Sequence, residues 1–314
     1  MKRTFALLST LLTLCGCSGG ADTAISGDDT PGGTDQSDRP KTAVSIMASV
    51  NAPYPGNGKD AEADNSYFTS GEKVGLFMND WKDNVTAEPL HAAANHANNI
   101  PLTYSDGWKG EETTYWKDAT TPADFYIYYP YTATVADARA FPFAVKEDQS
   151  SAEAFRASDV LTGMSKGVKP TEDAITLLLS HAFSRIEVTL LPGGGFSETA
   201  LQGSDISVRV NNVRCAATID MASATATAAG EAKSITTRKD NDTYNAIIVP
   251  QTVEGERLIS ITMGGKERHF SKAFTFEAGK IHRFSVTINN ANDAFDIAIT
   301  GWETDDIDHG GTAE

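Results

Sequence analysis

A serine in this 314-residue chain has the setting of a possible nucleophile. Gly163, Ser165 and Gly167 match the GxSxG pattern, in which a serine on a strand-to-helix turn attacks the substrate. The motif is followed by Val168-Lys169-Pro170, where a helix cannot begin cleanly. We therefore expect residues 163–173 to form a polar loop without a catalytic serine.

Metal-ligating residue types occur in two places. His91 and His96 lie in a segment rich in Ala and Asn, with no third ligand nearby in sequence. A second group reproduces part of a calcium loop, but the glycine and terminal glutamate of that loop are missing. Its members are Asp60, Glu62 and Asp64. Because no acid–base pair, nucleophile set or metal-ligand set stands out, the sequence predicts neither an enzyme nor a bound cofactor or metal.

The first seventeen residues carry an export signal. Lys2, Arg3 and the apolar stretch from Phe5 to Leu14 are typical of a secretory signal peptide. About ten apolar residues are too few to span a bilayer as a helix. The run Leu14-Cys15-Gly16-Cys17 resembles a bacterial lipobox, which implies cleavage before Cys17 and acyl chains on Cys17. We expect residues 1–16 to be a lipoprotein signal peptide; an ordinary signal peptide with a chance cysteine is the alternative.

The net charge and the cysteine content exclude some partners and a disulfide in the folded part. The formal net charge is −16, which argues against nucleic-acid partners and against docking on anionic lipid. Cys15 would leave with the leader and Cys17 would be lipidated, so the folded part has no second cysteine for a disulfide with Cys215. Cys215 falls in the apolar phase of the alternating run 213–219, which predicts a buried free thiol.

Alternating runs predict strands in the first half of the chain. Residues 44–50 and 73–78 place apolar side chains on one face, and the aromatic run 123–129 ends at a proline. Residues 79–117 are polar and are expected to form long loops with short strands, and 149–155 a helical turn.

The second half predicts a further block of strands from residue 175 onward. Residues 206–210 and 213–219 flank Asn211-Asn212, which predicts a hairpin with a tight turn. His181 lies within an apolar strand and is expected to be structural. The remaining strands are expected at 184–190, 244–249, 258–263, 268–276, 281–288 and 295–302.

Many short strands without a long amphipathic helix predict an all-β protein of antiparallel sandwiches. A tether rich in Gly, Ser, Thr and Asp is expected before the first strand, because it contains too little apolar surface to fold. The predicted organisation is a flexible tether at 17–41, an N-terminal β-sandwich at 42–174, a C-terminal β-sandwich at 175–304 and an acidic tail at 305–314.

Six short segments occur in the order found in one known family. They are Gly71–Phe77, Ala123–Tyr131, Leu179–Ile186, Tyr244–Gln251, Phe276–Lys280 and Ile299–Trp302. Together they cover about residues 42–304 and resemble the fimbrillin-like, or Mfa-like, proteins of Bacteroidetes. The resemblance implies two tandem antiparallel transthyretin-like β-sandwich domains in a lipoprotein precursor of a type V fimbrial subunit. It also implies a structural, tip or accessory role in a pilus that acts in adhesion.

The resemblance implies assembly by strand exchange with other fimbrial subunits. In the family, a protease cuts after an arginine beyond the tether, and a strand donated by a neighbouring subunit fills the groove. The candidate cut sites here are Arg39, which precedes Pro40, and Lys41, which suits only a lysine-tolerant enzyme. Residues 18–38 contain no strand-like segment to release. We therefore expect a tip, accessory or non-polymerising member rather than a stalk subunit.

The same resemblance places the chain at the cell surface. It implies a lipid anchor on Cys17 in the outer membrane, or a place in the fimbrium after processing, and a host or bacterial surface ligand. Asp22-Thr23-Ala24 resembles the acceptor that this phylum uses for O-glycosylation, which makes Thr23 a candidate site. The alternative function is a lipid-anchored glycan-binding module. Its carbohydrate face would use Tyr126, Tyr128, Tyr129 and Tyr131, which are otherwise expected in core and edge packing.

Overall fold

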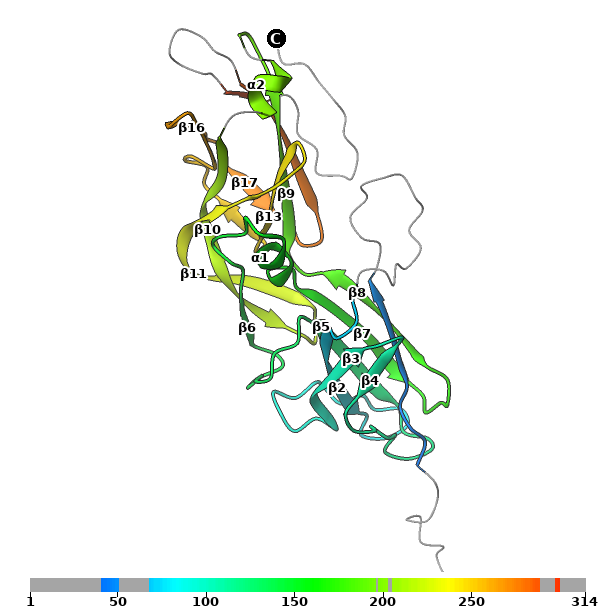
Figure 1. Ribbon diagram of the computed structural model, residues 1–314. Helices are drawn as coiled ribbons and strands as arrows, with labels where there is room; N and C mark the ends of the chain where they lie inside the picture. The colour runs from blue at the N-terminus through cyan, green and yellow to red at the C-terminus, as the bar shows by residue number, and fades with distance from the viewer. Residues whose placement is uncertain (1–40, 51–67, 196, 203–204, 289–296, 300–314) are drawn as a thin grey trace, which may run out of the picture. The chain divides into compact units, whose positions relative to one another are not determined.

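The described residues are almost entirely β-structure, which confirms the predicted all-β class (Figure 1). The computed structural model describes residues 41–50, 68–195, 197–202, 205–288 and 297–299. Several predicted features lie outside these ranges: the signal peptide, the tether with Cys17, Thr23 and Arg39, the acidic run Asp60–Asp64, and the tail 305–314.

The first sheet is built from strands of the first part of the chain, from β1 to β8. Its strand order is β1-β8-β7-β5-β2-β3-β4. The strands are β1 (Ile46–Val50), β2 (Lys73–Asp80), β3 (Ala97–Tyr104), β4 (Trp108–Gly110), β5 (Ala123–Tyr129), β7 (Leu161–Val168) and β8 (Ile175–His181). Buried residues alternate with exposed ones along β8, so one face of that strand enters the core.

Two further sheets and a short ribbon form the rest. The second sheet has the order β11-β10-β15-β16, and β6 also pairs with β10. Its strands are β6 (Phe141–Ala144), β10 (Ile206–Asp220), β11 (Thr225–Thr236), β15 (Ile259–Met263) and β16 (Lys266–Phe270). The third sheet has the order β12-β13-β9-β18-β19. Its strands are β9 (Ser184–Pro192), β12 (Arg238–Asp240), β13 (Thr243–Ile248), β18 (Ile281–Ile288) and β19 (Ile297–Ile299), and the ribbon pairs β14 (Gln251–Val253) with β17 (Phe274–Phe276).

Two short helices interrupt the strands. Helix α1 (Ala152–Ala157) overlaps the helical turn predicted at residues 149–155 and extends two residues beyond it, and Ser151 caps it by accepting a hydrogen bond from the Ala154 amide. Helix α2 (Glu198–Gln202) follows β9. Both helices are too short to be stable alone, so the surrounding sheets must hold them in place.

Strands β2 and β5 are buried on both faces, which explains their nearly continuous apolar sequences. On β5, Phe125 and Ile127 join one hydrophobic cluster, whereas Tyr126 and Tyr128 join the other. The cluster with Phe125 and Ile127 also contains buried residues of β1, β7 and β8. The second cluster also includes Phe183 and most of the buried residues of the second and third sheets.

The predicted domain boundary between residues 174 and 175 stays a prediction. Strand β8 begins at Ile175 but belongs to the first sheet, and β6 precedes the boundary but pairs with β10 of the second sheet. Residues from Lys41 onward form one compact unit.

The predicted hairpin at residues 206–219 is wrong. Residues 206–219 are one long strand, β10, rather than a hairpin. Asn212 adopts a positive φ of 59°, which asparagine tolerates, and the ladder is irregular between Val210 and Val213. The Asn211 amide donates to the Arg257 carbonyl at 2.8 Å, so the pair of asparagines ties β10 to a neighbouring loop instead of turning the chain.

The sheets are also not purely antiparallel. β1 runs parallel to β8, and β9 runs parallel to β18. Each parallel pair joins segments more than 90 residues apart in sequence, so no local pattern could reveal it.

Candidate functional site

Strand β1 forms one edge of the first sheet and is the element nearest to the predicted processing sites. Its partner is β8, in a parallel register that pairs Ile46 with Ile175 and Val50 with Leu179 (Figure 1). Ala48 and Val50 are buried in the core. The indole nitrogen of Trp108 on β4 donates to the Ala48 carbonyl at 2.9 Å. Because β1 is an edge strand, its backbone is paired with another strand on one side only. The burial of its side chains and the hydrogen bond from Trp108 also hold it in place.

The residues just before β1 are hydrogen-bonded as well. The amide of Trp116 donates to the Thr42 carbonyl at 3.0 Å, and the amide of Val44 donates to the Thr114 carbonyl at 2.8 Å. Ala43 forms a bridge with Tyr115. Backbone hydrogen bonds therefore hold residues 42–44, directly after Lys41, whose side chain is exposed. A protease that needs an extended substrate must detach residues 42–44 to cut after Lys41.

The segment around α1 was predicted to contain a helical turn, but its contacts with the sheets were not predicted. Gln149 is fully buried. Its side-chain carbonyl accepts from the Ile247 amide at 2.8 Å, and its side-chain amide donates to the Ile247 carbonyl at 2.9 Å. The Gln149 side chain thereby makes the two hydrogen bonds that the backbone of a neighbouring strand would make at Ile247 of β13. Nearby, the amide of Val145 donates to the Cys215 carbonyl at 2.9 Å.

Adjacent residues of α1 contact different sheets. The Phe155 ring lies between two guanidinium groups of the third sheet, with Arg185 at 5.7 Å and Arg238 at 5.8 Å from the ring centre. The Arg156 guanidinium instead binds both carboxylate oxygens of Glu72, at 2.9 and 2.8 Å, at the start of β2. We call residues 145–157 the bracket.

The Glu72 carboxylate has two further donors. The Tyr129 hydroxyl donates to it at 2.7 Å, and the Thr69 amide at 2.6 Å. Burial raises the pKa of Glu72, but these hydrogen bonds and the Arg156 charge outweigh burial and lower it. Glu72 and Tyr129 both lie in the segments that carry the family resemblance, so the structure gives those segments a physical role.

The predicted GxSxG loop is a strand. Ser165 lies on β7, paired with Phe125 of β5, and the chain that follows in residues 169–174 is not helical. A nucleophile elbow needs a strand-to-helix turn. The pattern is therefore a coincidence of sequence, as expected. Of the loop predicted at residues 163–173, residues 163–168 belong instead to β7, and 169–173 are outside any strand or helix.

The predicted histidines have separate partners. His96 contacts Asp80 at 2.6 Å, and His91 contacts Glu88 at 3.8 Å. Across the described part of the chain, no group of three or more His, Cys, Asp or Glu side chains is arranged to hold a metal ion. His181 is buried and pairs with Asp159 at 2.8 Å, as expected for a structural histidine.

Three of the four tyrosines proposed for a carbohydrate face are buried. Tyr126, Tyr128 and Tyr129 lie in the core, and Tyr131 is half-buried. Burial raises the pKa of Tyr128 to about 12. The core-packing hypothesis is thus confirmed for these three side chains, and the carbohydrate face they would form is absent.

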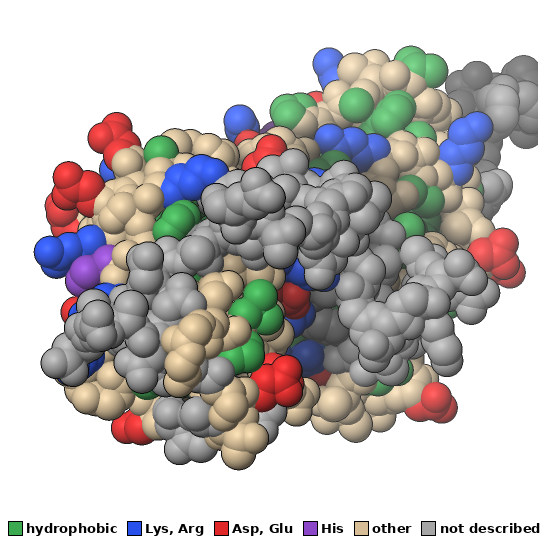
Figure 2. Space-filling view, turned by 90° about the horizontal axis from the view of Figure 1, so that it is seen from above, with side chains coloured by type: hydrophobic (Ala, Val, Ile, Leu, Met, Phe, Trp, Pro, Cys, Tyr) green, Lys and Arg blue, Asp and Glu red, His purple; other side chains and the backbone are tan. Residues whose placement is uncertain are grey.

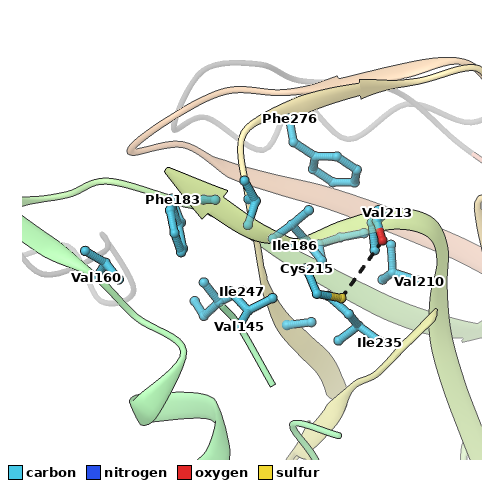
Figure 3. Close-up of a cluster of buried hydrophobic side chains, with 14 of the residues drawn as sticks. Val145, Val160, Phe183, Ile186, Val210, Val213, Cys215, Ile235, Ile247 and Phe276 are labelled. Atoms are coloured by element: carbon cyan, nitrogen blue, oxygen red, sulfur yellow. Dashed lines mark hydrogen bonds between the residues drawn. The ribbon is translucent and has the colours of Figure 1, made fainter. Parts of the chain in front are cut away.

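Cys215 is buried, as its place in the alternating run predicts, and it is a free thiol (Figure 3). Figure 3 shows it among apolar side chains that include Val145, Val213 and Ile235. Burial is the main cause that raises the pKa of the thiol, followed by the charge of Glu147. The protonated thiol acts as a small apolar side chain here.

The visible surface has no single-sign patch. Acidic and basic side chains are interspersed over the face in Figure 2, so the net charge is dispersed there. In the described residues no helix is long and apolar enough to cross a membrane.

Comparison with known proteins places this architecture in one family. A family model described as fimbrillin-like matches residues 61–302. A relative from Bacteroides uniformis, provisionally named fimbrium subunit Fim1C, is 23% identical over 312 residues, which cover 95% of this chain and 93% of the relative.

Two solved structures share the fold. A provisionally classed cell adhesion protein from Bacteroides ovatus has a TM-score of 0.67 at 16% identity and covers 85% of this chain and 98% of its own. Another from Bacteroides uniformis has a TM-score of 0.61 at 18% identity, with 83% and 97% covered. Because the family model spans most of the chain, this protein belongs to the fimbrillin-like family, as its motifs led us to expect.

Proposed function

We propose that this protein is a fimbrial subunit of the cell surface that acts in adhesion as a structural, tip or accessory piece. Membership of the fimbrillin-like family over residues 61–302 carries the proposal. The relative provisionally named fimbrium subunit Fim1C aligns over nearly the whole chain and supports it. The function requires surfaces for protein partners rather than a catalytic centre.

We also propose an architecture for the body of the protein and a lipid anchor that holds it to the membrane. The body is two tandem transthyretin-like β-sandwiches, at 42–174 and 175–304. Acyl chains on Cys17 hold it to the outer membrane through the tether 17–41, on which Thr23 is an O-glycosylation acceptor. The leader and lipobox residues support the anchor.

Assembly with other subunits would use strand donation at an edge other than that of β1. Both candidate cut sites, Arg39 and Lys41, precede β1, whose residues Ala48 and Val50 are buried in the core. Cleavage at either site therefore leaves β1 paired with β8. A body that keeps its own first strand suits a tip or accessory position better than a stalk position.

The alternative, a glycan-binding module, has lost its proposed binding face. Tyr126, Tyr128 and Tyr129 are buried, and their hydroxyls bond within the protein to Asp124, Asn99 and Glu72 respectively. An adhesion ligand would need a different surface.

Immunogold electron microscopy of cells that express the epitope-tagged full chain tests the function. We expect label on filaments and recovery of the chain in sheared filament preparations. The matched control is the Cys17→Ala chain, which should be exported but not retained by the membrane. Label confined to the cell body, with none on filaments, would contradict a fimbrial role.

A further inference from the structure

Strand β11 is an outer strand of the second sheet, and part of its free side has no partner. It pairs with β10, and near its C-terminal end Thr236 also forms a bridge with Asp148. Between Thr225 and Ala229 the ladder with β10 is regular, and no other strand of the described residues pairs with that segment (Figure 1). We call residues 225–229 the open edge.

The other outer strands are protected in ways that the open edge is not. An unpaired strand is a template for another chain, so proteins shorten, charge or cover their sheet edges. Among the strands that the structure describes, the other outer strands have at most five residues. Strand β16 begins with a lysine, a glutamate and an arginine, and Trp108 and residues 114–116 bond to β1 and the chain just before it. The open edge consists of threonine and alanine alone.

The backbone of the open edge presents hydrogen-bonding groups on its unpaired side. On the far side of β10, the Val145 amide donates to the Cys215 carbonyl at 2.9 Å, and β6 continues that pairing along residues 216–219. Successive residues of an antiparallel ladder bond on alternate sides. The registers of β6 and β11 on β10 therefore turn the amides and carbonyls of Ala226 and Ala228 away from β10. Such a row of donors and acceptors is complementary to another extended strand.

The side chains of the open edge define what kind of strand fits beside it. Ala226 and Ala228 pack against the hydrophobic cluster that contains Phe183, yet they are only half-buried, whereas Thr225 and Thr227 are exposed. An added strand would place every second side chain over the cluster and the others toward water. The segment that fits is therefore uncharged, with small or β-branched apolar residues alternating with polar ones.

We propose that the open edge accepts an extended strand from a neighbouring subunit of the fimbrium. The proposal rests on the fimbrial function proposed above and names the edge at which the neighbour attaches. No strand of this chain has to leave, because the new strand adds beside β11. A second copy pairing edge to edge would instead close into a two-fold dimer and leave neither edge for a filament. One edge that receives one neighbour suits a tip or accessory piece.

Lysine substitution of the open edge tests the attachment. Thr225→Lys with Thr227→Lys places two charges at the edge, and both threonines are exposed, so the fold should be kept. The matched control is Thr176→Lys with Ser180→Lys, at exposed positions on β8, which has a partner strand on each side. We expect recovery of the epitope-tagged full chain in sheared filaments to fall about tenfold for the first pair and to be unchanged for the control. Equal recovery would overturn the proposal.

A proline variant and hydrogen exchange test the backbone directly. Ala228→Pro removes an amide that faces the unpaired side, and edge strands tolerate proline, so filament recovery should fall while the urea midpoint of the mature chain stays close to that of the wild type. Independently of any variant, the amides of residues 225–229 that face away from β10 should exchange more slowly in filaments than in the isolated mature chain. Equal exchange in the two states would refute the added strand, even if a variant failed to fold.

The fimbrial function and this attachment fail in different ways. If the lysine and proline variants still enter filaments as well as the wild type, the attachment is wrong and the function stands. If the isolated mature chain forms a dimer that the open-edge lysines abolish, a second copy occupies the edge and the proposed neighbour is wrong. If the wild-type chain is absent from filaments, the function fails and the attachment fails with it.

Discussion

Gln149 offers the sharpest test of how the bracket holds the sheets together. Its side chain is fully buried and satisfies both the amide and the carbonyl of Ile247, with a third hydrogen bond to the Lys146 carbonyl at 3.1 Å. Gln149→Ala removes these bonds and leaves the two polar groups of Ile247 without their partner in the core. Each such orphan costs about 1–3 kcal/mol, so we expect the free energy of unfolding to fall by about 3–5 kcal/mol.

Gln251 provides a matched control. It makes the same pair of hydrogen bonds, to the amide and carbonyl of Arg214 at 2.8 and 2.9 Å, but at an exposed position. Water can replace Gln251 there, so Gln251→Ala should cost about 1 kcal/mol or less. Urea unfolding of the full mature chain, followed by tryptophan fluorescence, measures both variants. If the two substitutions destabilise the protein equally, burial does not decide the strength of this contact and our reasoning about the bracket is wrong.

Four further predictions concern single sites. Cys215→Asp buries an unpaired charge and should destabilise the protein by about 3–5 kcal/mol, and the native thiol should react slowly with a thiol reagent; fast native labelling would contradict its burial. Burial lowers the pKa of His282 below its usual 6.5, so the native state favours the neutral ring. Stability from this site is full above pH 6.5 and is lost as the pH falls below it; the slope of urea midpoint against pH should flatten in His282→Gln and would be unchanged if another group were responsible. Cys17→Ala should abolish incorporation of an alkyne palmitate analogue and release the chain from the membrane fraction, and an unlabelled wild-type chain would refute lipidation. An Arg-specific protease should leave the Arg39–Pro40 bond intact and form no polymers, whereas trypsin should cut slowly at Lys41; detergent-resistant ladders after Arg-specific cleavage would identify a stalk subunit instead.

Local pattern was sufficient to predict most strands. Strands β1 and β5 lie where the sequence predicts them, because the alternating run of β1 and the aromatic, β-branched run of β5 are signals carried by consecutive residues. Cys215 was assigned to the core for the same reason. Buried and exposed residues alternate on both sides of the irregularity near Asn212. Cys215 is therefore buried as predicted, even though the predicted hairpin is wrong.

Features that depend on distant partners could not be predicted. Gln149 reads as a polar residue before a short helix, and its partner Ile247 is 98 residues further along the chain. The parallel pairing of β1 with β8 has the same origin, since nothing within either strand specifies the other. The stretch from Gly163 to Gly167 contains turn-forming glycines, yet pairing with β5 makes it a strand, because tertiary contacts override weak local preference.

The bracket has a mechanical consequence for a protein that bears load. Successive residues of a helix point in directions about 100° apart, so Phe155 and Arg156 grip different sheets from one short helix. Tension that pulls these sheets apart must break the aromatic grip, the Glu72 ion pair or the Gln149 bonds before the chain between them can stretch. Helix α1 thus cross-links the first and third sheets through its side chains, in addition to the hydrophobic cluster that these sheets share.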